Sequence, residues 1–417
     1  MTEQTSPLMQ NLRRSGVWFA ASVLVLVASS IGLSRFLETE TPTASLALDP
    51  LNVNALIGEL TNELNDTSNA PDLDALLAKA ERALRFDLAD ARLYSLIGEI
   101  KYRQGEKDQA YELFDQARTL SKTEIHALQR SIGRSIETGD LPKAVGGIDI
   151  LLRRWPDQFP AIAEGLPTIL SDPAGYQAVL AAIRAAAPWR ASLLVALSNT
   201  PEGVDSANRL LLDLIGSSAP PKSGELSTVI NGYIRQKKYE QAYRLFLFSL
   251  SDEERKLGGY VFNGTFQPVS SKKPFDWQIR DQSGMEVTFA KSQDAVEGEG
   301  GATVRFLNTP VKNSALQQYI ELPPGAYKIS LIASARNLKL PKELFWSLRC
   351  PAGEIARFNI PEGTFNRQNL NQDFSIGLDT CPMQLLRLET AAIAESWRFR
   401  YVGTLVMHKL IIERLPS

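Results

Sequence analysis

The chain has 417 residues, of which 44% are hydrophobic and 22% are charged, and its formal net charge is -2 at pH 7. This length favours two or three domains over a single core. The near-neutral charge lacks the basic footprint that a phosphate backbone requires, which argues against nucleic acid as a partner. With 2 histidines and 2 cysteines in the whole chain, few ligands are available for zinc, haem or iron–sulfur groups. We therefore expect no metal and no cofactor.

Residues 16–34 are predicted to form a transmembrane helix. Gly16 to Leu33 runs for 18 residues without a charge, a helix of about 27 Å against a hydrocarbon layer of roughly 30 Å. Arg13 and Arg14 precede this run, whereas a single arginine and two glutamates follow it. The excess of arginine before the run predicts a cytoplasmic N-terminus. We therefore expect a single-pass protein of the bacterial inner membrane whose bulk is periplasmic.

Two neighbouring segments complete this prediction. Residues 1–15 would be the cytoplasmic N-terminus, and residues 35–54, rich in Thr, Pro, Asp and Asn, would be a linker. A cleaved secretory signal is the competing interpretation, because small residues at Ala28, Ser29 and Ser30 suit a signal peptidase. The length of the apolar run favours retention of the helix, and both interpretations export the rest of the chain.

The segment Ala91 to Lys122 divides into two antiparallel helices joined near Gly105. Small residues at Gly98 and Ala110 suit close contact between paired helices, and Phe114 suits the groove between neighbouring pairs. This segment resembles a tetratricopeptide repeat, although the proline that usually ends the family's repeat is replaced by Lys122. The resemblance implies a helical scaffold that contacts other proteins, here envelope or polysaccharide-assembly partners.

Weaker copies of the same pattern flank this repeat. Residues 125–156 repeat it in phase, because Gly139 stands 34 residues after Gly105. A further copy contains Tyr233, and prolines divide residues 160–222 into short helical hairpins. We therefore predict tetratricopeptide-like helices over residues 55–254.

Residues 255–417 change to short alternating runs separated by turn residues, which predicts at least eight strands in a sandwich or barrel. Leu316 to Ser334 contains two such runs around Pro323, Pro324 and Gly325, and we interpret them as a hairpin. The predicted fold class is thus a multidomain chain: one transmembrane helix, an all-α tetratricopeptide-like solenoid and an all-β sandwich.

The start of this β region carries a second resemblance. Val261 to Phe266, which contains Asn-Gly-Thr-Phe, is followed by Phe275, Asp276 and Trp277. This pattern resembles the start of carbohydrate-binding jelly rolls of the galactose-binding-like type, and it implies a jelly-roll sandwich. The order of anchor, repeats and sandwich is also similar to that of exported proteins associated with bacterial exopolysaccharide production. The resemblance implies polysaccharide as a ligand of the sandwich.

Carbohydrate binding commonly uses an aromatic ring on which a pyranose packs, with polar groups beside it. The sequence offers Trp397, with Arg398 as its polar neighbour, and Trp346 as carbohydrate-binding candidates. Trp397 is preferred because its surroundings are typical of a loop that enters a strand. For both tryptophans, packing within the core or at its rim is the alternative.

Both cysteines lie in the predicted sandwich. Cys350 ends one predicted strand and Cys381 precedes another. In an oxidising compartment we expect these two residues to form a disulfide, and two separate buried thiols are the alternative.

Three motifs that mark enzyme classes are missing from the sequence: a phosphate-binding loop with lysine, a His-Glu-x-x-His helix and a Gly-x-Ser-x-Gly elbow. We interpret the carboxylates of Asp276, Glu286, Glu354 and Asp373 as turn or solvated residues. We therefore expect a non-catalytic accessory or scaffold protein of exopolysaccharide synthesis or export. The alternatives are a structural envelope assembly factor whose sandwich binds protein and, third, a glycan-modifying enzyme.

Overall fold

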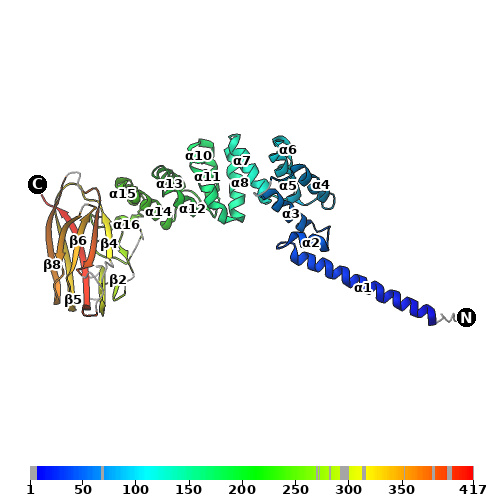
Figure 1. Cartoon of the computed structure of the whole chain (residues 1–417). Helices are drawn as coiled ribbons and strands as arrows, with labels where there is room; N and C mark the ends of the chain where they lie inside the picture. Colours follow the sequence, from blue (N-terminus) through cyan, green and yellow to red (C-terminus); the bar gives the residue numbers. More distant parts are fainter. Residues whose placement is uncertain are drawn as a thin grey trace. The chain divides into compact units, whose positions relative to one another are not determined.

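The computed structural model describes residues 7–66, 70–268, 271, 273–280, 283–291, 300–311, 316–351, 353–377, 381–391 and 397–416. The chain divides into two compact units, Met1–Ala182 and Ile183–Ser417. The first unit is helical, and the second contains further helices followed by two β-sheets (Figure 1). The division between the units therefore falls within the helical part of the chain, and the change from helix to strand lies inside the second unit.

The first unit opens with the long helix α1 (Pro7–Leu37). Within the described residues, Val17–Leu37 is the one helical segment long and apolar enough to cross a membrane, a property that signal sequences share. The remaining helices of this unit are α2 (Pro42–Leu48), α3 (Val53–Asn65), α4 (Leu73–Leu84), α5 (Ala91–Arg103), α6 (Lys107–Leu120), α7 (Ile125–Glu137), α8 (Leu141–Arg154), the 3₁₀ turn η1 (Pro156–Gln158), α9 (Phe159–Ala163), α10 (Leu166–Ser171) and α11 (Pro173–Arg184), which reaches the second unit.

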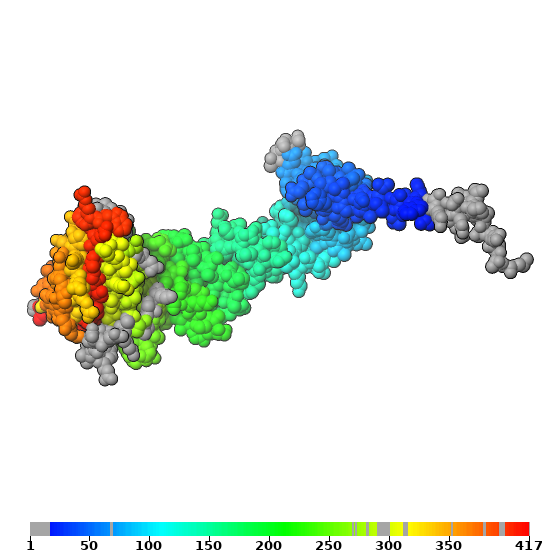
Figure 2. Space-filling model, turned by 90° about the horizontal axis from the view of Figure 1, so that it is seen from below, coloured from blue at the N-terminus to red at the C-terminus, as the bar shows by residue number. Residues whose placement is uncertain are grey.

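The segment predicted as a linker is folded. It contains α2 and the start of α3, and buried polar groups join it to the last turns of α1. The hydroxyls of Ser34 and Ser45 lie 2.8 Å apart, and the side-chain amide of Asn52 donates to Ser34 Oγ at 3.0 Å. The composition of this segment suggested a flexible tether. The contacts that fold it are made by polar side chains, which produce no hydrophobic periodicity in the sequence. In the space-filling view, α1 continues without a gap into the surface of the repeats that follow it (Figure 2).

The repeats have the paired helices that the sequence predicts. In α5 and α6, a Cβ atom added at Gly98 would lie 2.8 Å from the ring of Phe114, so only glycine permits this approach. The turn between these helices has Gly105 at φ 88°, and the turn between α7 and α8 has Gly139 at φ 77°. Both turns thus contain a residue with positive φ, in the left-handed region that favours glycine.

The second unit begins with helices of the same kind: α12 (Arg190–Leu197), α13 (Pro201–Leu214), α14 (Ser223–Arg235), α15 (Tyr239–Phe248) and the short α16 (Asp252–Arg255). Within this unit, α15 packs on the sandwich through aromatic rings. The ring of Phe246 lies 5.1 Å from that of Phe262 and 5.3 Å from that of Phe275. Nearby, the buried Lys273 ammonium donates to Ser249 O at 2.8 Å. Helix α15 of the last repeat therefore forms part of the hydrophobic surface that covers this side of the sandwich.

The sandwich consists of two antiparallel sheets of five strands, in the orders β1-β4-β9-β6-β7 and β2-β3-β10-β5-β8. We call the second the groove sheet. The strands are β1 (Gln278–Ile279), β2 (Met285–Lys291), β3 (Gly300–Pro310), β4 (Leu316–Ile320), β5 (Gly325–Lys339), β6 (Leu344–Cys350), β7 (Gly353–Asn359), β8 (Gly363–Ile376), β9 (Gln384–Thr390) and β10 (Arg400–Arg414). This is the jelly-roll sandwich that the sequence predicts.

One local prediction for this region, the hairpin around Pro323 to Gly325, is wrong. β4 and β5 do not form a hairpin, because β4 pairs with β1 and β9 whereas β5 pairs with β10 and β8. The Pro323–Gly325 turn instead carries the chain from one sheet to the other. The segment Val261 to Phe266, which carries the jelly-roll resemblance, forms a turn, in which Asn263 has φ 50° and its carbonyl accepts from Trp277 Nε1 at 2.9 Å. Phe266 and Trp277 then enter the core between the sheets.

Candidate functional site

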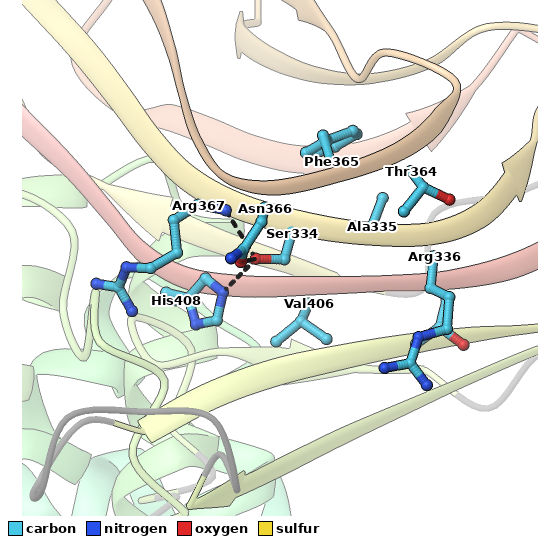
Figure 3. Close-up of a pocket in the computed structure, with 10 residues that line it drawn as sticks. Ser334, Ala335, Arg336, Thr364, Phe365, Asn366, Arg367, Val406 and His408 are labelled. Atoms are coloured by element: carbon cyan, nitrogen blue, oxygen red, sulfur yellow. Dashed lines mark hydrogen bonds between the residues drawn. The ribbon is translucent and has the colours of Figure 1, made fainter.

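The outer surface of the groove sheet carries a cavity of about 800 Å³. Strands β5, β8 and β10 supply its walls, and Figure 3 shows its side chains. It is lined by Ser334, Ala335, Arg336, Thr364, Phe365, Asn366, Arg367, Thr404, Val406 and His408. We call this cavity the sandwich groove.

Ser334 on β5 is the centre of the hydrogen bonds in the sandwich groove (Figure 3). Its Oγ lies 2.9 Å from His408 Nε2 on β10, and it lies 3.1 Å from Asn366 Oδ1 on β8. The same oxygen accepts from the backbone N–H of Arg367 at 2.9 Å. One hydroxyl thus ties together the side chains or backbone of three adjacent strands.

Irregular pairing on both sides of β5 produces this arrangement. On β10 the register shifts between Met407 and Lys409, so His408 is an extra residue beside Ser334. On β8 the register shifts opposite Ala333 and Ala335, and Arg367 has φ 44° there. A β-bulge redirects the side chains next to it and commonly occurs at functional sites. Here two bulges face the same serine from opposite sides.

The strands that form the sandwich groove differ in what they bury. On β5, Ala333 and Ala335 are buried toward the core, and Ser334 and Arg336 face outward. This alternation is what a half-buried strand requires. On β8, in contrast, the stretch from Gly363 to Asp373 has no fully buried residue, because β8 is an edge strand of its sheet.

The chemistry of the sandwich groove is polar and positively charged. Its lining supplies the guanidinium groups of Arg336 and Arg367, the amide of Asn366 and several hydroxyls, and the described residues of this lining include no carboxylate. Such groups donate to and accept from hydroxyls, and a guanidinium recognises a carboxylate in a bidentate manner. Phe365 lines the groove but also packs on the hydrophobic core. The arrangement therefore suits hydrogen bonding to a polyhydroxylated or acidic ligand more than stacking on a ring.

The two tryptophans predicted as binding platforms have different positions. Trp346 is fully buried, with its ring 5.7 Å from that of Trp277 in the core, so it presents no face to a ligand. The prediction for Trp346 is wrong, because β6 is a central strand of its sheet and points this ring between the sheets. Trp397 is 67% exposed and lies 5.2 Å from the Arg400 guanidinium. Neither Trp397 nor its exposed neighbour Arg398 lines the sandwich groove, and their role in binding stays a prediction.

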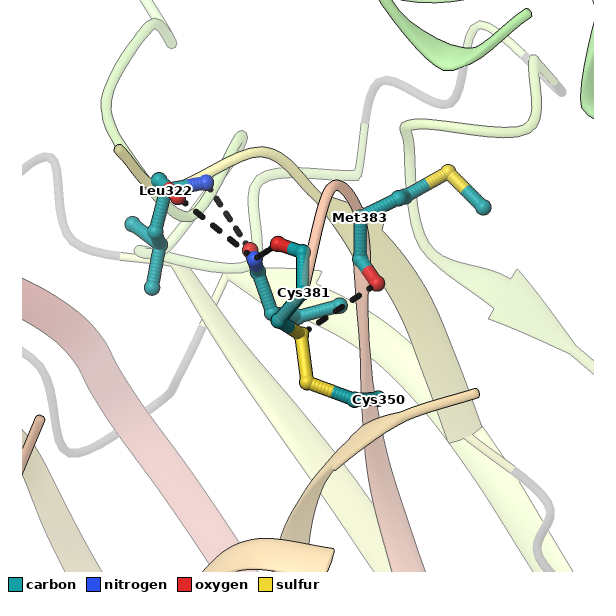
Figure 4. Close-up of a disulfide and its surroundings, with 5 residues drawn as sticks. Leu322, Cys350, Cys381 and Met383 are labelled. Atoms are coloured by element: carbon teal, nitrogen blue, oxygen red, sulfur yellow. Dashed lines mark hydrogen bonds between the residues drawn. A yellow bond between two sulfur atoms is a disulfide. The ribbon is translucent and has the colours of Figure 1, made fainter. Parts of the chain in front are cut away.

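The predicted disulfide between Cys350 and Cys381 is confirmed (Figure 4). It joins the end of β6 to the segment before β9 across a Cα–Cα distance of 5.4 Å. The buried side chain of Gln384 donates to Cys381 O at 2.7 Å and accepts from Leu322 N at 2.8 Å. The bridge therefore fixes one end of the sandwich and does not take part in the groove.

The four carboxylates considered for catalysis do not meet. Asp276 is fully buried and accepts from Ser271 N and Trp277 N at 2.6 and 2.7 Å; burial raises the pKa of its carboxyl, against the effect of these hydrogen bonds. Glu354 and Arg357 both lie on β7, in the sheet that does not carry the groove, and they form an ion pair with each other. Glu286 and Asp373 lie on the two edge strands of the groove sheet, which are separated by four strand spacings of roughly 4.8 Å, and the two residues are also offset along the strands. A glycosidase pair requires about 5 to 10 Å.

The repeats contain a second groove, of about 480 Å³, which we call the repeat groove. Its lining comes mainly from the first helices of successive pairs, α3, α5 and α7. At its centre, Glu99 accepts from Arg103 Nε at 3.1 Å and forms an ion pair with Arg130 at 2.7 Å. Arg130 also lies over the ring of Tyr102 at 4.1 Å. Two arginines of this groove, Arg103 and Arg130, are thus held by a carboxylate within it.

Both regions have counterparts among solved structures. A CBM4 structure covers 37% of this chain and 99% of its own, at 15% identity and a TM-score of 0.27. The module TmCBM61, solved in complex with beta-1,4-galactotriose, covers 38% of this chain and 99% of its own, at 16% identity and a TM-score of 0.26. YrrB, a TPR protein with an unusual peptide-binding site, covers 50% of this chain and 89% of its own, at 14% identity and a TM-score of 0.25. Values this low transfer no ligand to this chain.

No protein-family model and no curated protein sequence matches the chain. The helical repeats and the sandwich are therefore identified from the structure and from the sequence patterns that it explains.

The sequence did not point to the residues of the sandwich groove. Ser334 ends a run that was predicted as a strand, but its contact with His408 depends on a bulge that leaves no mark in the sequence. Asn366 and Arg367 lie in the polar part of β8, which lacks the alternation by which strands are found. The one usable signal was the unusual density of Asn, Gln and Arg from Asn366 to Gln372.

Proposed function

We propose that this chain is a non-catalytic, membrane-anchored protein of the bacterial envelope that binds an acidic polysaccharide in the sandwich groove and contacts protein partners through its repeats. In this proposal α1 stays in the inner membrane, the remainder of the chain is periplasmic, and the protein serves exopolysaccharide synthesis or export. The apolar length of Val17–Leu37 and the disulfide, which requires an oxidising compartment, support the location.

The convergence of two bulges on Ser334 carries the binding proposal. It directs His408, Asn366 and Arg367 to one cavity, and hydrogen bonds to Ser334 hold the side chains of His408 and Asn366 and the backbone of Arg367 before any ligand arrives. Side chains held in place in this way lose little freedom on binding. The two guanidinium groups, with no carboxylate among the described residues that line the groove, favour a uronate-containing chain over a neutral one.

The test is binding of the full chain, in detergent or nanodiscs, to acidic and neutral polysaccharides by affinity electrophoresis. Arg336→Gln and Arg367→Gln should each weaken binding of an acidic polysaccharide at low salt and reduce the dependence of binding on salt concentration. Arg357→Gln on the other sheet makes the same change in net charge and is the control. It should leave binding unchanged.

Equal retention of acidic and neutral polysaccharides by the original chain would contradict the preference for acidic ligands. If no polysaccharide is retained and crosslinking recovers protein partners on the sandwich, the chain is a structural assembly factor instead. Polysaccharide turnover by the purified chain would contradict the non-catalytic assignment.

The repeat groove supports the second part of the proposal. It is open along α3, α5 and α7 and offers guanidinium, carboxylate and apolar groups together. This mixture suits an extended protein segment more than a uniformly charged polymer. Crosslinking from a photoreactive group at Gln129, which lines this groove, should recover a protein partner from cells.

A further inference from the structure

The exposed apolar side chains of the first unit are concentrated on one edge of the repeats. Beyond α1, the large hydrophobic residues of this unit that are exposed within the described residues are Leu48, Leu51, Phe86, Leu88, Leu120 and Ile136. Phe86 and Leu88 are 60% and 67% exposed in the loop between α4 and α5, and Leu51 is 61% exposed before α3. We call Leu48, Leu51, Phe86 and Leu88 the apolar edge.

Hydrogen bonds connect the two parts of the apolar edge to the end of α1. Glu38, one residue after α1, accepts from Asn54 Nδ2 at 3.1 Å, and Arg92 Nη2 donates to Asn54 Oδ1 at 2.7 Å. Arg92 Nε in turn donates to Asp90 Oδ1 at 3.0 Å, at the end of the loop that carries Phe86 and Leu88. The loop, the start of α3 and the end of α1 therefore meet at one place.

Helix α2 runs back along α1 rather than away from it. Thr41 N donates to Leu37 O, Ser45 Oγ donates to Ser34 O, and the carbonyl of Leu48 accepts from Ser30 Oγ at 2.8 Å. Leu48 therefore stands level with Ser30, about 10 Å before the end of α1 at a rise of 1.5 Å per residue.

Ser30, the residue beside which Leu48 lies, falls within the apolar segment Val17–Leu37. From Val17 to Ser30 the helix is only about 21 Å long, whereas the hydrocarbon layer is roughly 30 Å thick and the full segment Val17–Leu37 is about 31 Å long. If the segment spans the membrane, its last two turns and the α2 residues beside them lie in the outer part of the bilayer.

We propose that the apolar edge rests in the outer interface of the membrane, so that the first repeats are seated on the lipid surface rather than held away from it. This rests on the proposed membrane span of α1 and adds a second, peripheral contact to it. Burial of these four apolar side chains in lipid would remove their contact with water, which favours the seated position.

The charges near the apolar edge indicate the kind of contact. The charged residues there are Arg35, Arg85 and Arg92 against Glu38, Glu40, Asp49, Asp87 and Asp90. This excess of acidic groups does not attract anionic headgroups. The contact is therefore apolar insertion into the interface, and it should not depend on anionic lipid.

The experiment uses the full chain in phosphatidylcholine vesicles, with one nitroxide label at an introduced cysteine and without reductant, so that the native disulfide stays closed. Labels at Leu51→Cys and Leu88→Cys should be several-fold more accessible to oxygen relative to a water-soluble nickel complex than a label at Ile136→Cys. Ile136 is also exposed, but it lies at the end of α7, beside the turn that leads to α8, and not at the end of the helices where the apolar edge lies. A label at Val25→Cys, within α1, reports whether the anchor is inserted.

Each outcome decides between the two proposals. If Val25 lies in lipid but the labels at Leu51 and Leu88 match that at Ile136, the apolar edge does not touch the membrane and only the anchor stands. If the label at Val25 is in water, the anchor and the apolar edge both fail. Lipid accessibility at Leu51 and Leu88 that requires anionic lipid would overturn insertion as the mode of contact.

Discussion

The repeat groove and the sandwich groove use the same basic residue, arginine, in opposite ways. In the repeat groove, Glu99 holds Arg103 and Arg130 through ion pairs, so part of the positive charge is balanced inside the site. In the sandwich groove, Arg336 and Arg367 share a lining that has no carboxylate among its described residues. The positive charge is therefore partly paired in the first site and without a carboxylate partner in the described lining of the second. The comparison teaches that the local balance of charge, not the net charge of -2, decides which ligands each unit attracts.

Removal of the disulfide should have the largest effect of the changes considered. The bridge lies only in the second unit, which contains the sandwich, so its removal should distinguish the two units. Replacing Cys350 and Cys381 by serine should lower the free energy of unfolding of that unit by about 3 to 4 kcal/mol, the loop-closure value for a separation of 31 residues. Hydrogen exchange of the full chain would measure protection in both units. Equal loss of protection in α5–α8 and in the sandwich would contradict independent units.

Packing of the repeats can be tested at Gly98. Gly98→Ala should destabilise the first unit by about 1 to 3 kcal/mol, because the new methyl group would lie 2.8 Å from the Phe114 ring. Gly133→Ala is the matched control, since nothing lies within 4 Å of a Cβ there and alanine favours a helix by about 0.5 to 1 kcal/mol. Thermal unfolding of both variants should shift in opposite directions, and a shift in the same direction would show that Gly98 is not needed for close packing.

The hydrogen bonds at the centre of the sandwich groove can be tested by a substitution at Ser334. Ser334→Ala removes the hydroxyl that holds three neighbouring groups and should weaken polysaccharide binding about tenfold, or about 1.4 kcal/mol. Ser330→Ala on the same face of β5 is the control, because Ser330 does not line the groove. Affinity electrophoresis measures both. Similar weakening by the two variants would place the binding surface elsewhere on the sheet.

The smallest expected effect concerns the repeat groove and would make it resemble the sandwich groove. Glu99→Gln removes the carboxylate that faces Arg103 and Arg130, so acidic peptides should bind more tightly at low salt, by about 0.5 to 1 kcal/mol. Fluorescence anisotropy with an acidic peptide and its amidated, neutral equivalent measures this change. Tighter binding of both peptides would show that charge is not the cause.

The sequence predicted well those features that depend on local period. The apolar run, the helix pairs with Gly105 and Gly139 at their turns, and the alternation of β5 all repeat at the spacing of one secondary structure. The disulfide was also predictable, because only one pairing of 2 cysteines exists within the chain.

The tertiary structure alone decided where the functional surfaces lie. Trp346 was buried by the position of β6 in its sheet, and the polar part of β8 became a strand because β5 offers it backbone partners. Likewise, the segment after α1 folded through hydroxyl and amide contacts among Ser34, Ser45 and Asn52. Sequence period records which face of an element is apolar. It does not record bulges, sheet order or polar contacts between distant residues, and these features build the sandwich groove and the apolar edge.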